Sequence, residues 1–329
     1  MKAITLSGFG GPEMMQYSDI ETPTPGEGQI LIRVHATSVN RPDVIQRQGN
    51  YPPPPGDSEV LGLEVAGVVE STGAGCERFR AGDRVVALVG GGGYAEYALA
   101  LENHSMALAE SISFEQAACI CETYITAWLN LFLLGELQDK KTVLIHGGGG
   151  GVATSAIQLC RALTPATEIL VTASTGKLER VSAQGAHHVI DYREQSFADE
   201  VRRITDKRGV DVILDHIGAK YLDSNMKSLA LAGTLMLIGV MGGIKAELNL
   251  ATMMVKRQRI IGSVLRSRPI AEKASIIAKF EAAVMPLIAA GTVTPLVDAT
   301  FPLAEAAAAH TMMERGGHFG KIVLIMPNT

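Results

Sequence analysis

A run of five glycines, residues 147–151, is the stretch whose composition and position point most directly to chemistry. The apolar run Val143–Ile145 before it suits a buried strand, and the pattern after it has a helical period. A flexible linker would lie between polar or proline-rich segments, and a P-loop would close with glycine, lysine and a hydroxyl residue, so neither fits. What remains is the dinucleotide fingerprint Gly148-x-Gly150-x-x-Ala153. Its glycines allow a tight turn and bring a pyrophosphate close to a helix N-terminus.

The turn therefore predicts a dinucleotide site. The residues expected to line it are Gly148, Gly149, Gly150, Gly151 and Val152. His146 borders the turn, where it either packs against the cofactor or only ends the strand.

The end of the next predicted strand, EILVTA, distinguishes between the two nicotinamide cofactors. An NAD site places Asp or Glu there to accept a hydrogen bond from the ribose 2′-hydroxyl. Here the chain continues as ASTGK, residues 173–177, without a carboxylate. Ser174 and Lys177 can bind a 2′-phosphate, and Tyr192, at the end of the third strand, can lie over the adenosine ribose. The sequence favours NADPH, although a lysine in this place is also typical of a solvated first helical turn.

The periodicity of the chain indicates which elements hold these residues. Residues 1–122 contain short β-type segments with glycine-rich turns, typical of a small antiparallel barrel or sandwich. Residues 114–137 have the pattern of one long helical stretch. Six β-type segments then alternate with helices between Val143 and Leu265, as a doubly wound parallel sheet requires. Two helices and a last strand follow, and we expect this final stretch to return to the first domain.

Composition excludes several classes of protein. The 329 residues are 47% hydrophobic and 19% charged, as in a globular protein with room for two domains. A net charge of -5 gives no general attraction to nucleic acid or to an anionic membrane. The N-terminus lacks the apolar core of a signal peptide, and the four cysteines make no disulfide framework. These features predict a cytoplasmic protein that binds neither membrane nor nucleic acid.

Taken together, the sequence resembles the medium-chain dehydrogenase/reductase superfamily, and within it the zinc-independent quinone oxidoreductases of the zeta-crystallin group. The resemblance is carried by the segments VLGLEVAGVV (60–69), GDRV (82–85), GGGGGVATSAIQLCR (147–161) and GKIVL (320–324). NRPDVIQRQGNYPPPPG (40–56) and VLRSR (264–268) look like the tumour-suppressor-inducible NADPH quinone oxidoreductase branch. Ala153 departs from the glycine that commonly ends the motif, but it is still small.

The resemblance implies an α/β architecture with two domains. A doubly wound Rossmann NADP(H)-binding domain of residues 123–266 would interrupt a discontinuous, β-rich GroES-like catalytic domain of residues 1–122 and 267–329. It also implies a homodimer, formed through edge strands of the nucleotide domains.

The sequence predicts no metal site. The superfamily's zinc alcohol dehydrogenases use a cysteine in the first domain and a His-Glu pair, whereas here SVNRPD has no cysteine and the pair is Leu63-Glu64. Cys119 and Cys121 lie in an apolar helical pattern, where a lone C-x-C is far more often part of the core. Without a Lewis acid, a quinone or an activated enone is the easier substrate, because its own conjugation delocalises the incoming electrons.

Four residues are candidates for the catalytic role. Tyr51 opens the stiff loop YPPPPG and either offers a phenol or packs on the prolines. Asn40, at the place of the lost cysteine, can orient substrate or cofactor, and Asp43 is either its partner or a helix cap. Arg266 follows the sixth strand and can reach a substrate oxygen or a dimer neighbour.

Two further segments are expected at the nicotinamide. Gly239, Met241 and Gly242 follow the fifth strand, where the nicotinamide normally lies, and Phe319 and Lys321 can close over it from the returning tail.

The leading hypothesis is an NADPH-dependent quinone oxidoreductase that acts by positioning without a metal. The alternatives are an NADPH-dependent enone or 2-alkenal reductase, a non-catalytic protein that binds or senses NADPH, and a purely structural oligomer.

Overall fold

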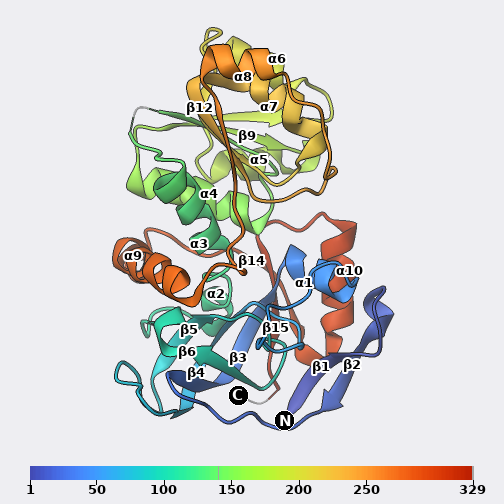
Figure 1. Ribbon diagram of the computed structural model, residues 1–329, viewed down its shortest axis with the longest axis vertical. Coiled ribbons are helices and arrows are strands. Elements are labelled where there is room, and N and C mark those ends of the chain that lie inside the picture. Colours follow the sequence, from blue (N-terminus) through green and yellow to red (C-terminus); the bar gives the residue numbers. More distant parts are fainter. Residues whose placement is uncertain (140, 328–329) are drawn as a thin grey trace. The chain divides into compact units, whose positions relative to one another are not determined.

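The computed structural model describes residues 1–139 and 141–327, which form two units (Figure 1). The β-rich unit comprises Met1–Ile125 and the chain from Arg266 onward, and the parallel-sheet unit comprises Thr126–Leu265. The sequence predicted domain limits at 122/123 and 266/267, whereas the units change over at 125/126 and 265/266.

The parallel-sheet unit is built on a six-stranded sheet in the order β10-β9-β8-β11-β12-β13, with every pair parallel. This order is that of a doubly wound fold, in which the strand order reverses between β8 and β11. The expected Rossmann architecture is therefore confirmed. The strands are β8 (Thr142–Ile145), β9 (Glu168–Ala173), β10 (His188–Asp191), β11 (Val210–Asp215), β12 (Leu229–Leu237) and β13 (Arg259–Gly262). The helices are α4 (Gly151–Leu163), α5 (Leu178–Ala183), α6 (Phe197–Ile204), α7 (Leu222–Ser228) and α8 (Leu250–Lys256).

Apolar side chains of the inner strands form the core of this unit. Leu144, Leu170, Ile213 and Leu235, from four neighbouring strands, are fully buried in one cluster with Val201 of α6. In Figure 1, α6 lies beside α7, and both α7 and α8 contact β12. Strands buried on both faces need continuous apolar runs, which is why β8 is buried at each of its four positions.

The β-rich unit contains a largely antiparallel seven-stranded sheet in the order β14-β15-β3-β4-β5-β7, with β6 paired to β3. A separate two-stranded sheet joins β1 and β2. The strands are β1 (Lys2–Leu6), β2 (Met15–Asp19), β3 (Gln29–Val39), β4 (Glu64–Thr72), β5 (Arg84–Leu88), β6 (Tyr97–Leu101), β7 (Ser105–Ala107), β14 (Val297–Pro302) and β15 (Lys321–Ile325). Because β15 pairs with β3, with Ile322 opposite Val39, the tail completes this unit as the sequence predicted.

Helices of the β-rich unit are mostly short. They are α1 (Arg41–Arg47), α2 (Phe114–Ala117), α3 (Thr123–Trp128, which continues into the other unit), α9 (Ile270–Ala289) and α10 (Ala306–Arg315). The prediction of one long helical stretch over residues 114–137 was wrong. The chain turns at residues 118–122 between α2 and α3, and a π-helical segment, Leu129–Leu134, follows.

The helix is interrupted because other groups bind the backbone there. The Glu122 N–H donates to a carboxylate oxygen of Glu64 on β4, 2.8 Å away. The Thr123 hydroxyl donates to the Cys119 carbonyl at 2.7 Å. No helix within the described part of the chain is long and apolar enough to cross a membrane.

Candidate active site

The glycine run forms the turn between β8 and α4. Gly147 has φ +67°, a conformation that favours glycine, and a Cβ built on it would lie 2.5 Å from Cε1 of His216. A Cβ on Gly148 would lie 2.5 Å from a methyl group of Val171. Gly150 caps α4, which begins at Gly151. The first backbone N–H groups of a helix have no intrahelical acceptor, so this turn presents donors and a positive dipole end to an anion.

A chain of buried hydrogen bonds runs beneath the glycine turn. The Asn225 amide nitrogen donates to Asp215 at 3.0 Å, so the amide oxygen faces Nε2 of His146 at 2.8 Å. Nδ1 of His146 then accepts from the Thr172 hydroxyl at 2.9 Å, and that oxygen accepts the Gly147 N–H at 3.3 Å. Burial lowers the pKa of His146 to about 3, which is consistent with the neutral ring that this chain requires.

His146 was predicted to border the turn, and the structure places it under the turn with both ring nitrogens bonded to protein. Its ring also packs edge-on against Phe197 and Tyr221, with centroids 4.9 Å away in each case. It therefore supports the turn from below and has no polar atom left for a ligand.

The residues predicted to bind a 2′-phosphate lie together at the carboxyl ends of β9 and β10. The Tyr192 N–H donates to the Ala173 carbonyl at 3.2 Å, which brings Tyr192 beside Ser174. The side chain of Lys177 lies across the glycine turn, because a Cβ on Gly149 would lie 3.0 Å from its Nζ. An ammonium group at the edge of this turn suits an anionic ligand such as a phosphate.

One carboxylate near this end was missed by the sequence analysis. Asp191 ends β10, next to Tyr192. Hydrogen bonds from the Thr175 hydroxyl and the Arg193 N–H lower the pKa of Asp191. The Asp191 carboxylate is thus already hydrogen-bonded to neighbouring residues of the protein.

The loop that contains Gly239, Met241 and Gly242 follows β12 and packs on residues 216–218, which follow β11. Met241 and Gly242 donate backbone hydrogen bonds to the carbonyls of His216 and Ile217, at 3.1 and 2.6 Å. A Cβ on Gly239 would lie 3.1 Å from the Cβ of His216. His216 therefore lies against glycines that follow β8 and β12, where the strand order reverses. This partly exposed histidine was not among the predicted site residues, although its place directly after a strand was a signal.

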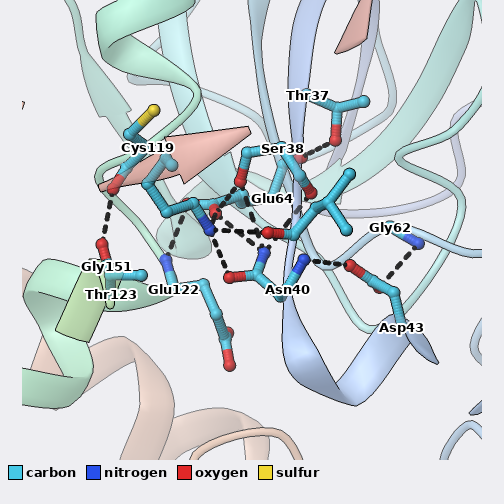
Figure 2. Close-up of polar contacts among 12 residues, drawn as sticks. Thr37, Ser38, Asn40, Asp43, Gly62, Glu64, Cys119, Glu122, Thr123 and Gly151 are labelled. Atoms are coloured by element: carbon cyan, nitrogen blue, oxygen red, sulfur yellow. Dashed lines mark hydrogen bonds and ion pairs between the residues drawn. The ribbon is translucent and has the colours of Figure 1, made fainter. Parts of the chain in front are cut away.

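The β-rich unit gathers its polar residues around Glu64, the first residue of β4 (Figure 2). One carboxylate oxygen accepts from the Ser38 hydroxyl, from the Asn40 amide at 2.9 Å and from the Lys321 ammonium at 3.2 Å. The other oxygen accepts the Glu122 N–H. Lys321 and Glu64 are both buried, so this is a desolvated ion pair whose polar atoms are bonded.

Lys321 has two further acceptors in this cluster, the Val39 carbonyl at 3.2 Å and the Asn40 amide oxygen. The three protons of the ammonium are therefore matched by three oxygens of its own unit. The Asn40 amide is equally engaged, since its nitrogen donates to Glu64 and its oxygen accepts from Lys321. Both predicted site residues thus hold the cluster together. Phe319, which was also predicted at the nicotinamide, is buried. It lies shortly before Lys321 in the chain.

Asp43 lies in the first turn of α1 and is completely buried. Its carboxylate accepts the Asn40 N–H at 2.7 Å, the Gly62 N–H at 3.2 Å and the Tyr94 hydroxyl at 3.3 Å. Burial raises its pKa to about 6, against the effect of these donors and of Lys321. The sequence suggested that Asp43 is either the partner of Asn40 or a helix cap. These contacts support both roles, because Asp43 accepts the Asn40 N–H at the start of α1.

Tyr51 and Arg266 form a pair in the same unit. The guanidinium of Arg266 lies 5.1 Å from the centre of the Tyr51 ring, and its nitrogens donate to the carbonyls of Tyr51 and Gly90. Arg266 is almost fully buried. Burial, followed by the charge of Glu122, raises the pKa of Tyr51. Arg266 therefore fixes the proline loop and the ring at its start.

Glu122 is a second acidic residue, besides Asp191, that was not among the predicted site residues. Its carboxylate makes no hydrogen bond to any residue in the described ranges, and Figure 2 shows its side chain extending away from the cluster around Glu64. Burial, followed by the charge of Glu64, raises its pKa to about 8. Residues 117–134 around it are otherwise uncharged, so the sequence signal was its position as the single charge in that run.

Within residues 1–139 and 141–327 no three His, Cys, Asp or Glu side chains come together as metal ligands. Cys119 and Cys121 are fully buried, and burial raises the pKa of both thiols, which disfavours the thiolate that a metal binds.

Comparisons with known proteins identify the family of this chain. The alcohol dehydrogenase GroES-like domain matches residues 26–110, and the zinc-binding dehydrogenase family matches residues 184–324. Quinone oxidoreductase of Rattus norvegicus is 34% identical over 330 residues, which cover 99% of this chain and 98% of the relative.

Solved structures show the same likeness. A quinone oxidoreductase of Pseudomonas syringae has a TM-score of 0.89 at 30% identity, covering 98% of this chain and 99% of its own. Escherichia coli quinone oxidoreductase complexed with NADPH has a TM-score of 0.89 at 27% identity, covering 99% of this chain and 100% of its own. The chain belongs to the medium-chain dehydrogenase/reductase superfamily of oxidoreductases, and quinone oxidoreductases are among its full-length relatives.

Proposed function

We propose that this protein is a zinc-independent NADPH:quinone oxidoreductase. The observation that carries the proposal is the buried cluster of Lys321, Glu64 and Asn40, in a chain whose full-length relatives include quinone oxidoreductases. The ammonium of Lys321 already binds the oxygens that a metal would need at Asn40 and Glu64, and its charge would repel a divalent cation there. The residues present do not fit zinc, so the reaction is derived without it.

NADPH is the proposed cofactor for a reason that lies in the parallel-sheet unit. Lys177 lies across the glycine turn, and Ser174 and Tyr192 lie beside each other at the ends of β9 and β10. This set offers a cation and hydroxyl groups to a 2′-phosphate. The known NADPH complex of the Escherichia coli relative supports the same choice.

A quinone is the proposed acceptor because the protein needs only to place it correctly against the nicotinamide and does not have to stabilise much developing charge. A conjugated acceptor spreads the charge of the incoming hydride over its own carbonyls. Correct placement of two reactants can supply as much as about 7–11 kcal/mol of the barrier. The Arg266–Tyr51 pair and the cluster around Glu64 are held by buried polar contacts, which favour precise placement.

The test is NADPH oxidation with an ortho-quinone, beside the same assay with an activated enone and with NADH. The proposal predicts rapid turnover with the quinone and NADPH. Turnover with the enone alone would instead make the protein an enone reductase. NADPH binding without consumption by either acceptor would make it a non-catalytic NADPH-binding protein.

We also propose that two copies pair through β13. This strand ends the order of the parallel sheet, and Met254, Val255 and Val264 near it are exposed apolar residues. An exposed edge strand presents unpaired backbone groups to a second chain. The cytoplasmic location inferred from the sequence stays a prediction.

A further inference from the structure

Glu122 is held by its backbone while its carboxyl group is left open. The residue lies at the break between α2 and α3, where its N–H is bound to Glu64 on β4 at 2.8 Å. This bond fixes the start of the side chain, which then extends away from the Glu64 cluster (Figure 2). The side chain is partly exposed, and its carboxyl accepts no hydrogen bond from the described residues.

Charged and titratable groups surround Glu122 on four other segments of the β-rich unit. Glu64 on β4 and Asp43 on α1 make its ionisation harder, while Lys321 on β15 and Arg266 make it easier. Burial is the largest influence, and the balance gives a pKa of about 8. At neutral pH the carboxyl is therefore mostly protonated and is a hydrogen-bond donor.

The other acidic groups of this unit that lie near Glu122 are already engaged. Glu64 accepts four hydrogen bonds, including one from an ammonium. Asp43 is fully buried and accepts three. Tyr51 interacts electrostatically with Glu122, but its phenol is the weaker acid, because burial raises its pKa from an already high value. Among the described residues of this group, Glu122 is thus the stronger of the two acids that are protonated at neutral pH and not already engaged.

We propose that Glu122 donates the proton that accompanies the hydride, a role that rests on the proposed quinone reductase activity. The C–H bond at C4 of the nicotinamide breaks, and its electron pair moves with the hydrogen to the quinone. The Glu122 carboxyl gives its proton to a quinone carbonyl oxygen and becomes a carboxylate. Water then reprotonates it. The sum is NADPH, quinone and one proton giving NADP⁺ and hydroquinone.

The geometry explains why this acid can be recharged. A donor sealed like Asp43 would exchange protons slowly, whereas Glu122 is partly exposed and has no partner to break. The nearby Arg266 stabilises the carboxylate after transfer, because its charge lowers the pKa of Glu122. The Glu122 carboxyl is therefore neutral before it gives up its proton, and the charge of Arg266 stabilises the carboxylate afterwards.

The experiment measures single-turnover NADPH oxidation by an ortho-quinone from pH 6 to pH 10 in the wild type, in Glu122→Gln and in Glu122→Asp. A general acid contributes about 10²–10⁴-fold, so Glu122→Gln should lose at least about tenfold at pH 7 with an unchanged Kd for NADPH. The wild-type rate should fall as pH rises through about 8, because the acid form is lost. Glu122→Gln should show no such fall, and Glu122→Asp should regain a pH-dependent rate.

Glu115→Gln is the matched control, since Glu115 is a partly exposed glutamate on the preceding helix. It should keep the wild-type rate and pH profile. A Glu122→Gln protein whose rate is within about twofold of wild type, with the same pH profile, would overturn the proton-donor role alone. If the wild type does not oxidise NADPH when a quinone is supplied, the proposed function and this role are both overturned.

Discussion

At the scale of single residues, the buried ion pair of Lys321 and Glu64 affects stability. Lys321→Met would leave the Glu64 carboxylate buried without its cation, which typically costs about 3–5 kcal/mol in the free energy of unfolding. The double variant Lys321→Met/Glu64→Gln should regain a large part of that loss, because the uncompensated charge is gone. Urea unfolding of both single variants and the double variant measures the coupling. Additive effects would mean that the ion pair is not the source of the stability.

Lys177 tests the choice of cofactor. Lys177→Ala should raise the KM for NADPH by about 10–100-fold, the value of one or two charge-assisted hydrogen bonds, and leave the KM for NADH nearly unchanged. Lys227→Ala, at an exposed lysine on α7 of the same unit, is the control for a general change of charge. Equal effects of Lys177→Ala on the two cofactors would contradict the assignment of the 2′-phosphate to this residue.

At the scale of elements, the hydrogen-bond chain under the glycine turn makes stability depend on pH. The pKa of His146 falls from 6.5 to about 3 on folding, so below pH 6.5 the unfolded chain takes up a proton that the folded chain does not. This histidine therefore lowers the free energy of unfolding by about 1.4 kcal/mol for each pH unit between 6.5 and 3.

His146→Gln removes that titration. The stability advantage of the wild type over the variant should be largest near pH 7 and should shrink at this rate on acidification, as thermal or urea unfolding at several pH values would show. The comparison is needed because Asp43 and Asp215, whose pKa values are raised to about 6, act in the opposite direction in both proteins. A constant difference between the proteins would contradict a neutral, buried His146.

How much of the fold the sequence predicts depends on whether its cause is local. The glycine turn, the six parallel strands and the return of the tail follow from turn chemistry, periodicity and the GKIVL resemblance, all contained in short segments. The break at residues 118–122 does not, because the carboxylate that binds Glu122 belongs to Glu64, far away in the chain. The acceptors of Lys321 do not follow for the same reason: nothing local shows that its ammonium binds Glu64 and Asn40. Glu122 and His216 were missed because burial and neighbours, not residue type, mark them.

At the scale of the whole molecule, the proposed dimer predicts that the mass of the protein in solution is that of two chains. The wild type should elute as a dimer in size-exclusion chromatography with light scattering. Val264→Glu should shift it to a monomer, because a charge beside the β13 edge disfavours strand pairing between chains. Ile270→Glu, at an exposed isoleucine of the β-rich unit, should leave the dimer intact. A monomeric wild type at micromolar concentration would contradict pairing at this edge.

The central claim is that hydride passes from NADPH to a quinone without a metal. The most direct measurement is the rate of NADPH oxidation by an ortho-quinone before and after exhaustive chelation, with the zinc content of the same samples determined by mass spectrometry. The cluster of Lys321, Glu64 and Asn40 predicts an undiminished rate in protein that contains almost no zinc. A rate that falls in proportion to the zinc removed, and returns when zinc is added, would contradict it.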